Sequence, residues 1–343
     1  MNGYDLRTMA SPKPRVFSGI QPSGGLHLGN YLGAIRNWVR DQDQYDNIFC
    51  VFDLHAMTLP WDAKLLRENT LQVAAVYLAC GIRQDTSSIF VQSRIAAHSE
   101  LAWILTCLTP MGWLERMTQF KEKSAGEQRE RVGTGLLSYP ALMAADILLY
   151  DTNFVPVGED QRQHIEYTRD LAQRVNQRFG PVLTLPEALI PKAGARIMGL
   201  DDPERKMSKT LAQANPGHAV FLMDPPEVIR KKFARAQTDA EPAVKFPPGP
   251  GVANLLQIYQ SVTETTAEHV ERTFAGKPYN ELKQAVAEAT IAALRPLQAR
   301  YREIRSDDAQ LVRELDRAAD RLAVTANATL ARVQRVTGLL GHD

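Results

Sequence analysis

Short apolar runs alternate with longer amphipathic stretches along the first half of the chain. Runs of strand length, rich in β-branched and aromatic residues, occupy residues 15–20, 47–53, 88–92 and 154–157. The spacing of apolar residues predicts helices over 26–40, 64–80 and 161–179, and two or three more within 98–150. Strands that alternate with helices favour an α/β fold built on a doubly wound parallel sheet.

The pattern changes in the second half. After about residue 200 the strand signals fade, and prolines at 216, 225 and 226 and the stretch 245–251 (KFPPGPG) mark loops. From residue 254 onward the spacing is helical, with an Ala/Arg/Glu/Leu-rich end over 282–336. A mostly helical second domain is therefore expected, with its boundary between residues 185 and 215.

Composition narrows the class of protein only a little. The chain has 343 residues, 44% hydrophobic and 23% charged, which suits two domains with a sizeable core. Its net charge is +1, so a nucleic-acid partner would have to bind local basic patches. Cysteines at positions 50, 80 and 107 form neither a disulfide framework nor a metal-ligand pattern. The cysteine pattern, the polar N-terminus and the absence of a long apolar run all favour a cytoplasmic protein.

The most informative segment is residues 17–35, FSGIQPSGGLHLGNYLGAI. Its pattern predicts a strand, a glycine-rich turn and the start of a helix, whose free N–H groups and dipole favour phosphate. His27 and Asn30 would share one helix face and can both hydrogen-bond to phosphate, and Gly29 would let a flat base approach the backbone. The alternative is a simple turn in which Ser23 caps the helix. The segment matches neither the dinucleotide pattern GxGxxG nor the P-loop.

The tetrapeptide at 27–30, HLGN, resembles the HIGH signature of class I aminoacyl-tRNA synthetases, with Asn at the fourth position. Residues 206–210, KMSKT, resemble the KMSKS loop of the same class, with Thr as the last residue. Lys206 and Lys209 follow Gly199, which suits a hinged loop, and their charges can stabilise a pentacovalent α-phosphate and the departing pyrophosphate. Taken alone, residues 206–210 would be interpreted as a solvated basic turn. Because they follow residues 27–30 in the order typical of the class, the two segments together favour a class I aminoacyl-tRNA synthetase.

A carboxylate indicates which amino acid is the substrate. Asp146 interrupts the apolar helical run 139–150, YPALMAADILLY. A buried carboxylate needs a partner, and an indole N–H, which only donates, would supply one and reject phenylalanine. Met143, one turn earlier, would line the ring, although an ordinary core position suits it too. The alternative is that Asp146 caps a neighbouring element or faces solvent.

Residues 154–161, FVPVGEDQ, give a further indication of a binding site. The strand would form an apolar wall and end at residues 158–160, on the side of the sheet where carboxylates commonly bind ribose hydroxyls. Asp160 with Gln163 also fits a helix capping box, and the two roles are compatible. Residues 196–200, RIMGL, directly precede the lysine loop.

These segments, together with ERMTQFKEKSAG at 115–126, resemble the bacterial-type tryptophanyl-tRNA synthetases from about residue 15 to the C-terminus. The resemblance implies a Rossmann-like catalytic domain over 14–200 that binds ATP and tryptophan. It implies a helical anticodon-binding domain over 201–300 and a C-terminal helical segment over 301–343 that packs back on the catalytic domain. It also implies a homodimer.

By position, the resemblance assigns roles to individual residues. The residues implied to contact ATP are Gln21, Pro22, Ser23, Gly29, Asn30, Gly158, Glu159, Asp160, Ile197, Lys206, Met207, Ser208, Lys209 and Thr210. Those implied to bind tryptophan are Asp146 at the indole, Gln161 at the α-amino group, and Phe17, Gly19, Gln21, His55, Tyr139, Met143, Val155 and Val157. Implied phosphate contacts are Lys121 and Lys123. The residues expected to stabilise the transition state are His27, Asn30, Lys206 and Lys209.

The implied reaction is attack of the tryptophan carboxylate on the α-phosphate of MgATP, then transfer to a hydroxyl of tRNA(Trp), with release of pyrophosphate and AMP. The carboxylate is ionised at neutral pH, so no general base is needed and catalysis rests on positioning and charge stabilisation. Mg²⁺ is expected to arrive with ATP, without a dedicated protein metal site. Some relatives bind an iron–sulfur cluster through four clustered cysteines, which this chain lacks, so no cluster is predicted.

Three other interpretations stay open at the level of sequence. A tyrosyl-tRNA synthetase would need side chains that hydrogen-bond a phenol. A non-catalytic relative that binds nucleic acid or senses tryptophan would be expected to lack His27 or the two lysines. A nicotinamide-dependent dehydrogenase would carry GxGxxG after its first strand. Arginines within 230–235 and 295–305 are candidates for tRNA phosphate contacts, or for a solvated face with i,i+4 partners.

Overall fold

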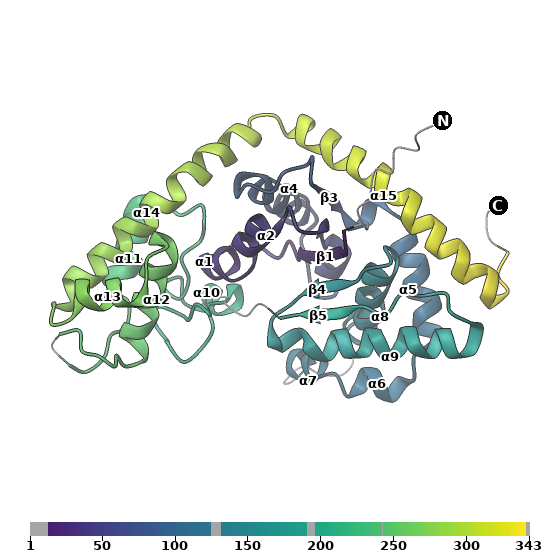
Figure 1. The fold of residues 1–343 in the computed structure, drawn as a ribbon, viewed down its shortest axis with the longest axis horizontal. Coiled ribbons are helices and arrows are strands. Elements are labelled where there is room, and N and C mark those ends of the chain that lie inside the picture. The colour runs from purple at the N-terminus through teal and green to yellow at the C-terminus, as the bar shows by residue number, and fades with distance from the viewer. Residues whose placement is uncertain (1–12, 125–131, 191–195, 242, 341–343) are drawn as a thin grey trace, which may run out of the picture.

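The computed structural model describes residues 13–124, 132–190, 196–241 and 243–340 of the chain. Figure 1 shows one lobe built around a parallel sheet and a second lobe made of helices, with two long C-terminal helices arching over both. Among the described residues, no helix combines the length and hydropathy that a membrane span requires.

The first lobe is organised by a five-stranded parallel sheet in the order β3-β2-β1-β4-β5. Its strands are β1 (Arg15–Ile20), β2 (Asp46–Val51), β3 (Ser87–Val91), β4 (Phe154–Pro156) and β5 (Glu187–Leu189). The predicted fold class, a doubly wound parallel α/β sheet, is confirmed. The chain builds outward from β1 to β3 and then returns to β4 on the other side of β1. Ligands of such sheets bind at this reversal, beyond the carboxyl ends of the strands.

Four strands lie where apolar runs predict them, whereas β5 has no signal in the sequence. It consists of Glu187, Ala188 and Leu189, a sequence poor in β-branched and aromatic residues. It is the edge strand beside β4, and its pairing with β4 makes it a strand.

Each face of the sheet contributes to a different hydrophobic cluster. Phe49 and Val51 of β2 belong to the cluster with α4 (Ala63–Ala79), while Ile48 and Cys50 belong to the cluster on the opposite face. The second cluster includes residues of α5 (Ala97–Leu108), α8 (Thr134–Leu148) and α9 (Arg162–Phe179). In the described part of the span where two or three helices are predicted, α6 (Met111–Glu115) and α7 (Thr118–Ser124) lie between α5 and α8, which makes four α-helices there.

The helix predicted over 26–40 is divided into three segments. They are α1 (Leu28–Asn30), the π-helical η1 (Tyr31–Ile35) and α2 (Arg36–Asp41). π-helical turns are rare and occur mostly at functional sites. A further short helix, α3 (Asp53–Ala56), follows β2 directly.

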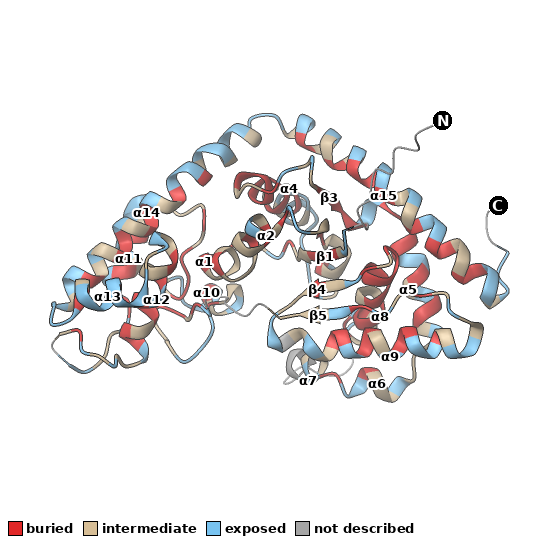
Figure 2. Ribbon diagram, in the orientation of Figure 1, coloured by how far each residue is buried: buried red, intermediate tan, exposed pale blue. Residues whose placement is uncertain are grey.

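The second lobe is helical, as the sequence pattern predicts. Its helices are α10 (Lys209–Ala214), α11 (Pro226–Ala234), α12 (Pro250–Thr263), α13 (Ala267–Phe274) and α14 (Tyr279–Ile304). The last helix, α15 (Asp308–Thr337), packs against β3, α4 and α5. Figure 2 shows buried residues along the inner side of α14 and α15 and exposed residues along the outer side. The domain boundaries given above remain predictions.

Candidate active site

Two segments leave the central strands at the reversal of the sheet. The glycine-rich turn follows β1, and residues 157–161 follow β4 and form the short η4 helix (Glu159–Gln161) before α9. Because β1 and β4 are parallel neighbours, both segments leave the same edge of the sheet. The structure therefore brings these two predicted parts of the ATP-binding site to one edge of the sheet, the edge at which ligands of such folds bind.

His27 is itself the N-cap of α1. Its Nδ1 accepts a hydrogen bond from Asn30 N–H (3.3 Å), and Asn30 Oδ1 accepts one from His27 N–H (3.1 Å). The prediction that both side chains lie on one face of a helix is therefore wrong in detail. His27 precedes the helix, and the two residues cap its first turn reciprocally. The alternative cap, Ser23, is wrong, because Ser23 is exposed and lies four residues before the cap.

Burial, together with the nearby charges of Lys209 and Lys206, lowers the pKa of His27 to about 3. The imidazole is therefore neutral at physiological pH. Since Nδ1 accepts a hydrogen bond, the ring proton lies on Nε2, which can donate to an anionic ligand. The oxygen of the Asn30 amide is used in the cap, which leaves its –NH₂ group as the donor. Both side chains thus offer hydrogen-bond donors without carrying charge.

The lysine loop begins as a small hairpin. Met198 and Lys206 form an antiparallel bridge, and Met207 N–H donates to Ile197 O (3.0 Å). Ser208 then caps α10 by accepting from Leu211 N–H (3.3 Å). Lys206 is exposed on this loop, and Met207 is buried.

Lys209 connects the lysine loop to the glycine-rich turn. Its Nζ lies 3.0 Å from Gly24 O and 3.5 Å from Ser23 Oγ. It also lies 3.5 Å from Gln21 O. Burial lowers the pKa of Lys209 to about 8. The structure thus brings together two signature segments that are far apart in the sequence.

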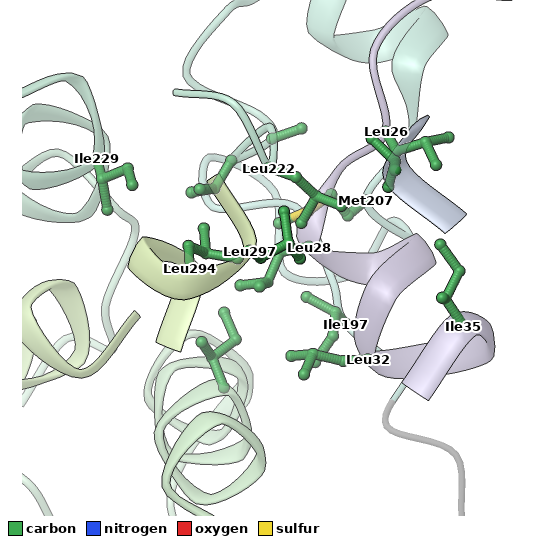
Figure 3. Close-up of a cluster of buried hydrophobic side chains, with 14 of the residues drawn as sticks. Leu26, Leu28, Leu32, Ile35, Ile197, Met207, Leu222, Ile229, Leu294 and Leu297 are labelled. Atoms are coloured by element: carbon green, nitrogen blue, oxygen red, sulfur yellow. The ribbon is translucent and has the colours of Figure 1, made fainter. Parts of the chain in front are cut away.

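Hydrophobic packing holds the two segments in this arrangement. Leu28, Met207 and Ile197 lie in one buried cluster with Leu222 and Leu297 of the second lobe (Figure 3). A Cβ atom at Gly29 would lie 3.1 Å from the His27 ring and 3.7 Å from Met207 Cβ, so the absent side chain permits this close approach. The packing accounts for the burial of Ile197, a predicted ATP contact.

Asp146 lies at the centre of the residues predicted to surround tryptophan. It is fully buried on α8, and its Oδ2 is 2.8 Å from His55 Nε2. Its Oδ1 accepts from Gln92 Nε2 (2.7 Å) and is 2.6 Å from His98 Nδ1. The alternatives in which Asp146 caps an element or faces solvent are wrong. Burial raises the pKa of Asp146, but the hydrogen bonds from His55 and His98 and the electrostatic interactions with these two side chains outweigh burial and lower the pKa to about 2.

The other predicted tryptophan residues lie around this carboxylate or in the cluster beside it. Phe17 and Val155 are buried in the same cluster, and Met143 and Val157 pack against it. The Tyr139 ring lies 6.2 Å from the His55 ring, edge to face. Gln21 donates to His55 O (3.1 Å), which links the predicted ATP and tryptophan residues.

Gly19 has a steric reason to be glycine. A Cβ atom there would lie 2.2 Å from Cys50 O and 2.7 Å from the Phe52 ring. Phe52 in turn contacts the rings of Phe17 and His55. The absence of a side chain at Gly19 therefore allows the aromatic residues to close over β1.

The remaining predicted residues lie at the periphery. Gly158, Glu159 and Thr210 are exposed, Gln161 is half-buried, Pro22 is buried, and Lys121 is exposed on α7. The side chains of Lys123 and Asp160 lie outside the described residues. Of the capping box proposed for Asp160 and Gln163, only Gln163 can be placed: its Oε1 accepts from Thr118 N–H, and the N-cap position of α9 is Gln161.

Apart from His55, sequence reasoning missed the residues that surround and support the Asp146 carboxylate. Gln92 could have been found, because it follows β3 directly and residues at strand ends face the crevice. His98 and Tyr150 carried no such signal, since both lie in apolar stretches that suit an ordinary core. Among the described residues, no group of three His, Cys, Asp or Glu side chains is arranged to hold a metal ion.

Comparison with known proteins agrees with this geometry. The family model "tRNA synthetases class I (W and Y)" matches residues 9–295. The tryptophan–tRNA ligase of Wolinella succinogenes is 51% identical over 329 residues, covering 96% of this chain and 99% of the relative. That of Synechocystis sp. is 52% identical over 334 residues, covering 96% and 98%.

Solved structures give the same result. The tryptophanyl-tRNA synthetase of Mycoplasma pneumoniae has a TM-score of 0.86 and 36% identity, covering 95% of this chain and 98% of its own. The Campylobacter jejuni enzyme, solved with ADP and tryptophan, has a TM-score of 0.83 and 33% identity, covering 95% and 100%. The sheet, the two signature segments and the matched model define a class I aminoacyl-tRNA synthetase of the tryptophan and tyrosine group. Within that group, the chain belongs to the tryptophan–tRNA ligase family.

Proposed function

We propose that the crevice at the ends of β1 and β4 activates L-tryptophan with ATP and passes it to tRNA(Trp), with the division of roles given below. The observation that supports these roles best is the 3.0 Å contact between Lys209 Nζ and Gly24 O, which joins the lysine loop to the glycine-rich turn. The activity itself is ATP-dependent formation of tryptophanyl-adenylate and then of tryptophanyl-tRNA, with release of pyrophosphate and AMP.

ATP is assigned to the two joined segments. The His27 Nε2–H and the Asn30 amide donate to phosphate oxygens, while Lys206 and Lys209 neutralise the charge that develops on the α-phosphate and on pyrophosphate. The other residues assigned to ATP are Gln21, Pro22, Ser23, Gly29, Gly158, Glu159, Asp160, Ile197, Met207, Ser208 and Thr210, with Lys121 and Lys123 as further phosphate contacts. Mg²⁺ enters with the nucleotide, because it usually keeps several waters and binds through substrate phosphates.

Tryptophan is assigned to the residues around Asp146. The ionised carboxylate accepts the indole N–H, and Gln161 holds the α-amino group. The apolar and aromatic side chains around it are Phe17, His55, Tyr139, Met143, Val155 and Val157, with Gly19 giving room. The tryptophan carboxylate attacks the α-phosphate in line, and because it is already ionised no side chain has to remove a proton.

Amino-acid-dependent ATP–pyrophosphate exchange, run with each of the twenty amino acids, tests this assignment. Exchange is expected with tryptophan and, within background, with none of the others. Exchange that depends on tyrosine would favour the tyrosyl interpretation, and no exchange with any amino acid would favour a non-catalytic relative.

The charge of Lys209 gives this reaction a defined pH dependence. Burial lowers the pKa of Lys209 from its usual 10.5 to about 8, so the ammonium form predominates below that pH and is lost above it. The kcat/KM for ATP is expected to fall about tenfold between pH 7 and pH 9. In Lys209→Arg the guanidinium stays charged, so the decline should disappear. An unchanged decline in that variant would assign the alkaline limb to another group.

We also propose that two copies of the chain form a dimer. The segment between α3 and α4 and the first turn of α4 expose several large apolar side chains: Met57 (42%), Leu59 (41%), Trp61 (52%) and Leu65 (61%). Large apolar side chains exposed so near one another in the chain suit an interface. Trp61→Glu is expected to shift the molecular mass in light scattering from dimer to monomer, while Val324→Glu on α15 should not. A monomeric wild type would contradict the dimer.

The helical lobe is proposed to bind the anticodon, within predicted boundaries of 201–300. Two of the candidate arginines are engaged within the chain, since Arg230 pairs with Glu288 (2.6 Å) and Arg305 pairs with Asp308 (2.7 Å).

The predicted cytoplasmic location is supported by the free thiols of Cys50, Cys80 and Cys107.

A further inference from the structure

A buried chain of polar side chains lies behind Asp146 and has no role in the reaction described above. Asp146 Oδ1 is 2.6 Å from His98 Nδ1, and His98 Nε2 is 2.7 Å from the Tyr150 hydroxyl. Gln92 Nε2 donates to the same Oδ1 at 2.7 Å. All four residues are fully buried, so bulk water does not reach these groups.

Hydrogen bonding fixes the direction of the protons along this chain. Asp146 is ionised and only accepts, so His98 Nδ1 carries a proton and donates it to Oδ1. Burial keeps the pKa of Tyr150 far above its usual value, so its phenol keeps its proton. Within the described residues, the Tyr150 hydroxyl has His98 Nε2 as its hydrogen-bond partner. His98 Nε2 therefore accepts the hydrogen bond that the hydroxyl donates. In the order Tyr150 to His98 to Asp146, each proton is directed toward the carboxylate.

The two carboxylate oxygens of Asp146 have different surroundings as a result. Oδ1 already accepts two hydrogen bonds, from His98 and Gln92. Oδ2 has one recorded partner, His55 Nε2, and so keeps a second acceptor direction. The His55 side chain is 12% exposed and contacts the rings of Phe52 and Tyr139, whereas His98 is wholly enclosed. The unused acceptor direction therefore belongs to the oxygen nearest the residues assigned to tryptophan.

We propose that His98 and Tyr150 are positioning residues for substrate specificity. Tyr150 orients His98, and His98 together with Gln92 saturates Oδ1. The carboxylate is thereby prevented from rotating about its Cβ–Cγ bond and presents Oδ2 as the acceptor for the indole N–H. This inference rests on the proposed role of Asp146. It differs from a purely structural role, because a network that only supports the fold would affect substrates with and without an N–H group equally.

A tryptophan analogue in which sulfur replaces the indole N–H, 3-benzothienyl-alanine, separates these roles. The measurement is the ratio of kcat/KM for tryptophan to that for the analogue in ATP–pyrophosphate exchange. Tyr150→Phe is expected to lower this ratio about three- to tenfold, and His98→Leu by at least as much. Tyr167→Phe is the matched control, because it also removes a buried phenol hydroxyl, one that is 2.9 Å from Thr109 Oγ1 and has no contact with Asp146.

Asp146→Asn, measured in parallel, distinguishes failure of the inference from failure of the proposed function. A ratio that falls in Asp146→Asn but not in the Tyr150 and His98 variants overturns the inference and leaves the role of Asp146 intact. A ratio unchanged in Asp146→Asn removes the indole contact and the inference with it. Equal losses for tryptophan and the analogue in the Tyr150 and His98 variants assign the two residues to structure alone, which also overturns the inference.

A measurement on the wild-type protein covers the case in which these variants do not fold. The ¹⁵N chemical shifts of the His98 ring report which nitrogen carries the proton. A neutral ring protonated on Nδ1 is expected. An imidazolium, or a ring protonated on Nε2, would overturn the proposed order of donors.

Discussion

Lys209→Ala is expected to lower kcat of tryptophan activation about 100- to 1,000-fold, while the KM for tryptophan changes little. The Lys209 ammonium lies on the glycine-rich turn, 3.0 Å from Gly24 O, where it can follow the charge that develops on the phosphates. Its charge matters most in the transition state, so its loss should appear in kcat. Single-turnover formation of the adenylate, measured by rapid quench, isolates this step.

Stability should not account for the loss in Lys209→Ala. Burial disfavours the ammonium form of Lys209 and lowers its pKa, so removing the charge is expected to leave the melting temperature unchanged or higher. Lys245→Ala, which removes a surface lysine paired with Glu241 in the second lobe, provides the control and should retain full activity. A rise in KM for ATP with unchanged kcat would mean that Lys209 contributes only uniform binding.

Asp146→Asn is expected to reduce the preference for tryptophan over phenylalanine about 10- to 100-fold. The carboxylate gives a charge-assisted bond to a donor, which is stronger than the bond an amide oxygen gives. The loss should fall mainly on tryptophan, because phenylalanine has no N–H to lose. Competitive pyrophosphate exchange with the two amino acids measures the ratio directly.

The same substitution should also lower stability. Three donors face the carboxylate, from His55, Gln92 and His98, and an amide –NH₂ cannot accept from any of them. An unsatisfied buried donor costs about 1–3 kcal/mol, so the melting temperature should fall. Asp239→Asn is the matched control, because Asp239 also accepts several bonds, from the N–H groups of Gly249 and Gly251, but lies in the second lobe. Unaltered selectivity in Asp146→Asn, with a lower rate for both substrates, would contradict the proposed role.

Local pattern was sufficient for much of the fold. The apolar runs that became β1 to β4 are short and rich in β-branched and aromatic residues, so their residue types alone indicate strands. For β5 there was no such signal, because three residues at a sheet edge become a strand only by pairing with β4. The division of residues 28–41 into α, π and α segments was equally hidden, since all three have helix-like apolar spacing.

The residue types alone indicated the chemistry of the site. They are a histidine and an asparagine after a glycine-rich turn, two lysines in a loop, and a carboxylate inside an apolar helix. Which of these groups touch depended on the tertiary structure alone. Lys209 lies against Gly24 because His27 pairs with Phe221 and Leu28 shares a buried cluster with Met207, which joins the two segments. Asp146 has its donors because α3, the turn after β3 and α5 place His55, Gln92 and His98 around it from separate parts of the chain. Sequence periodicity reports on neighbours within about one or two turns, whereas burial and proton direction depend on partners dozens of residues away.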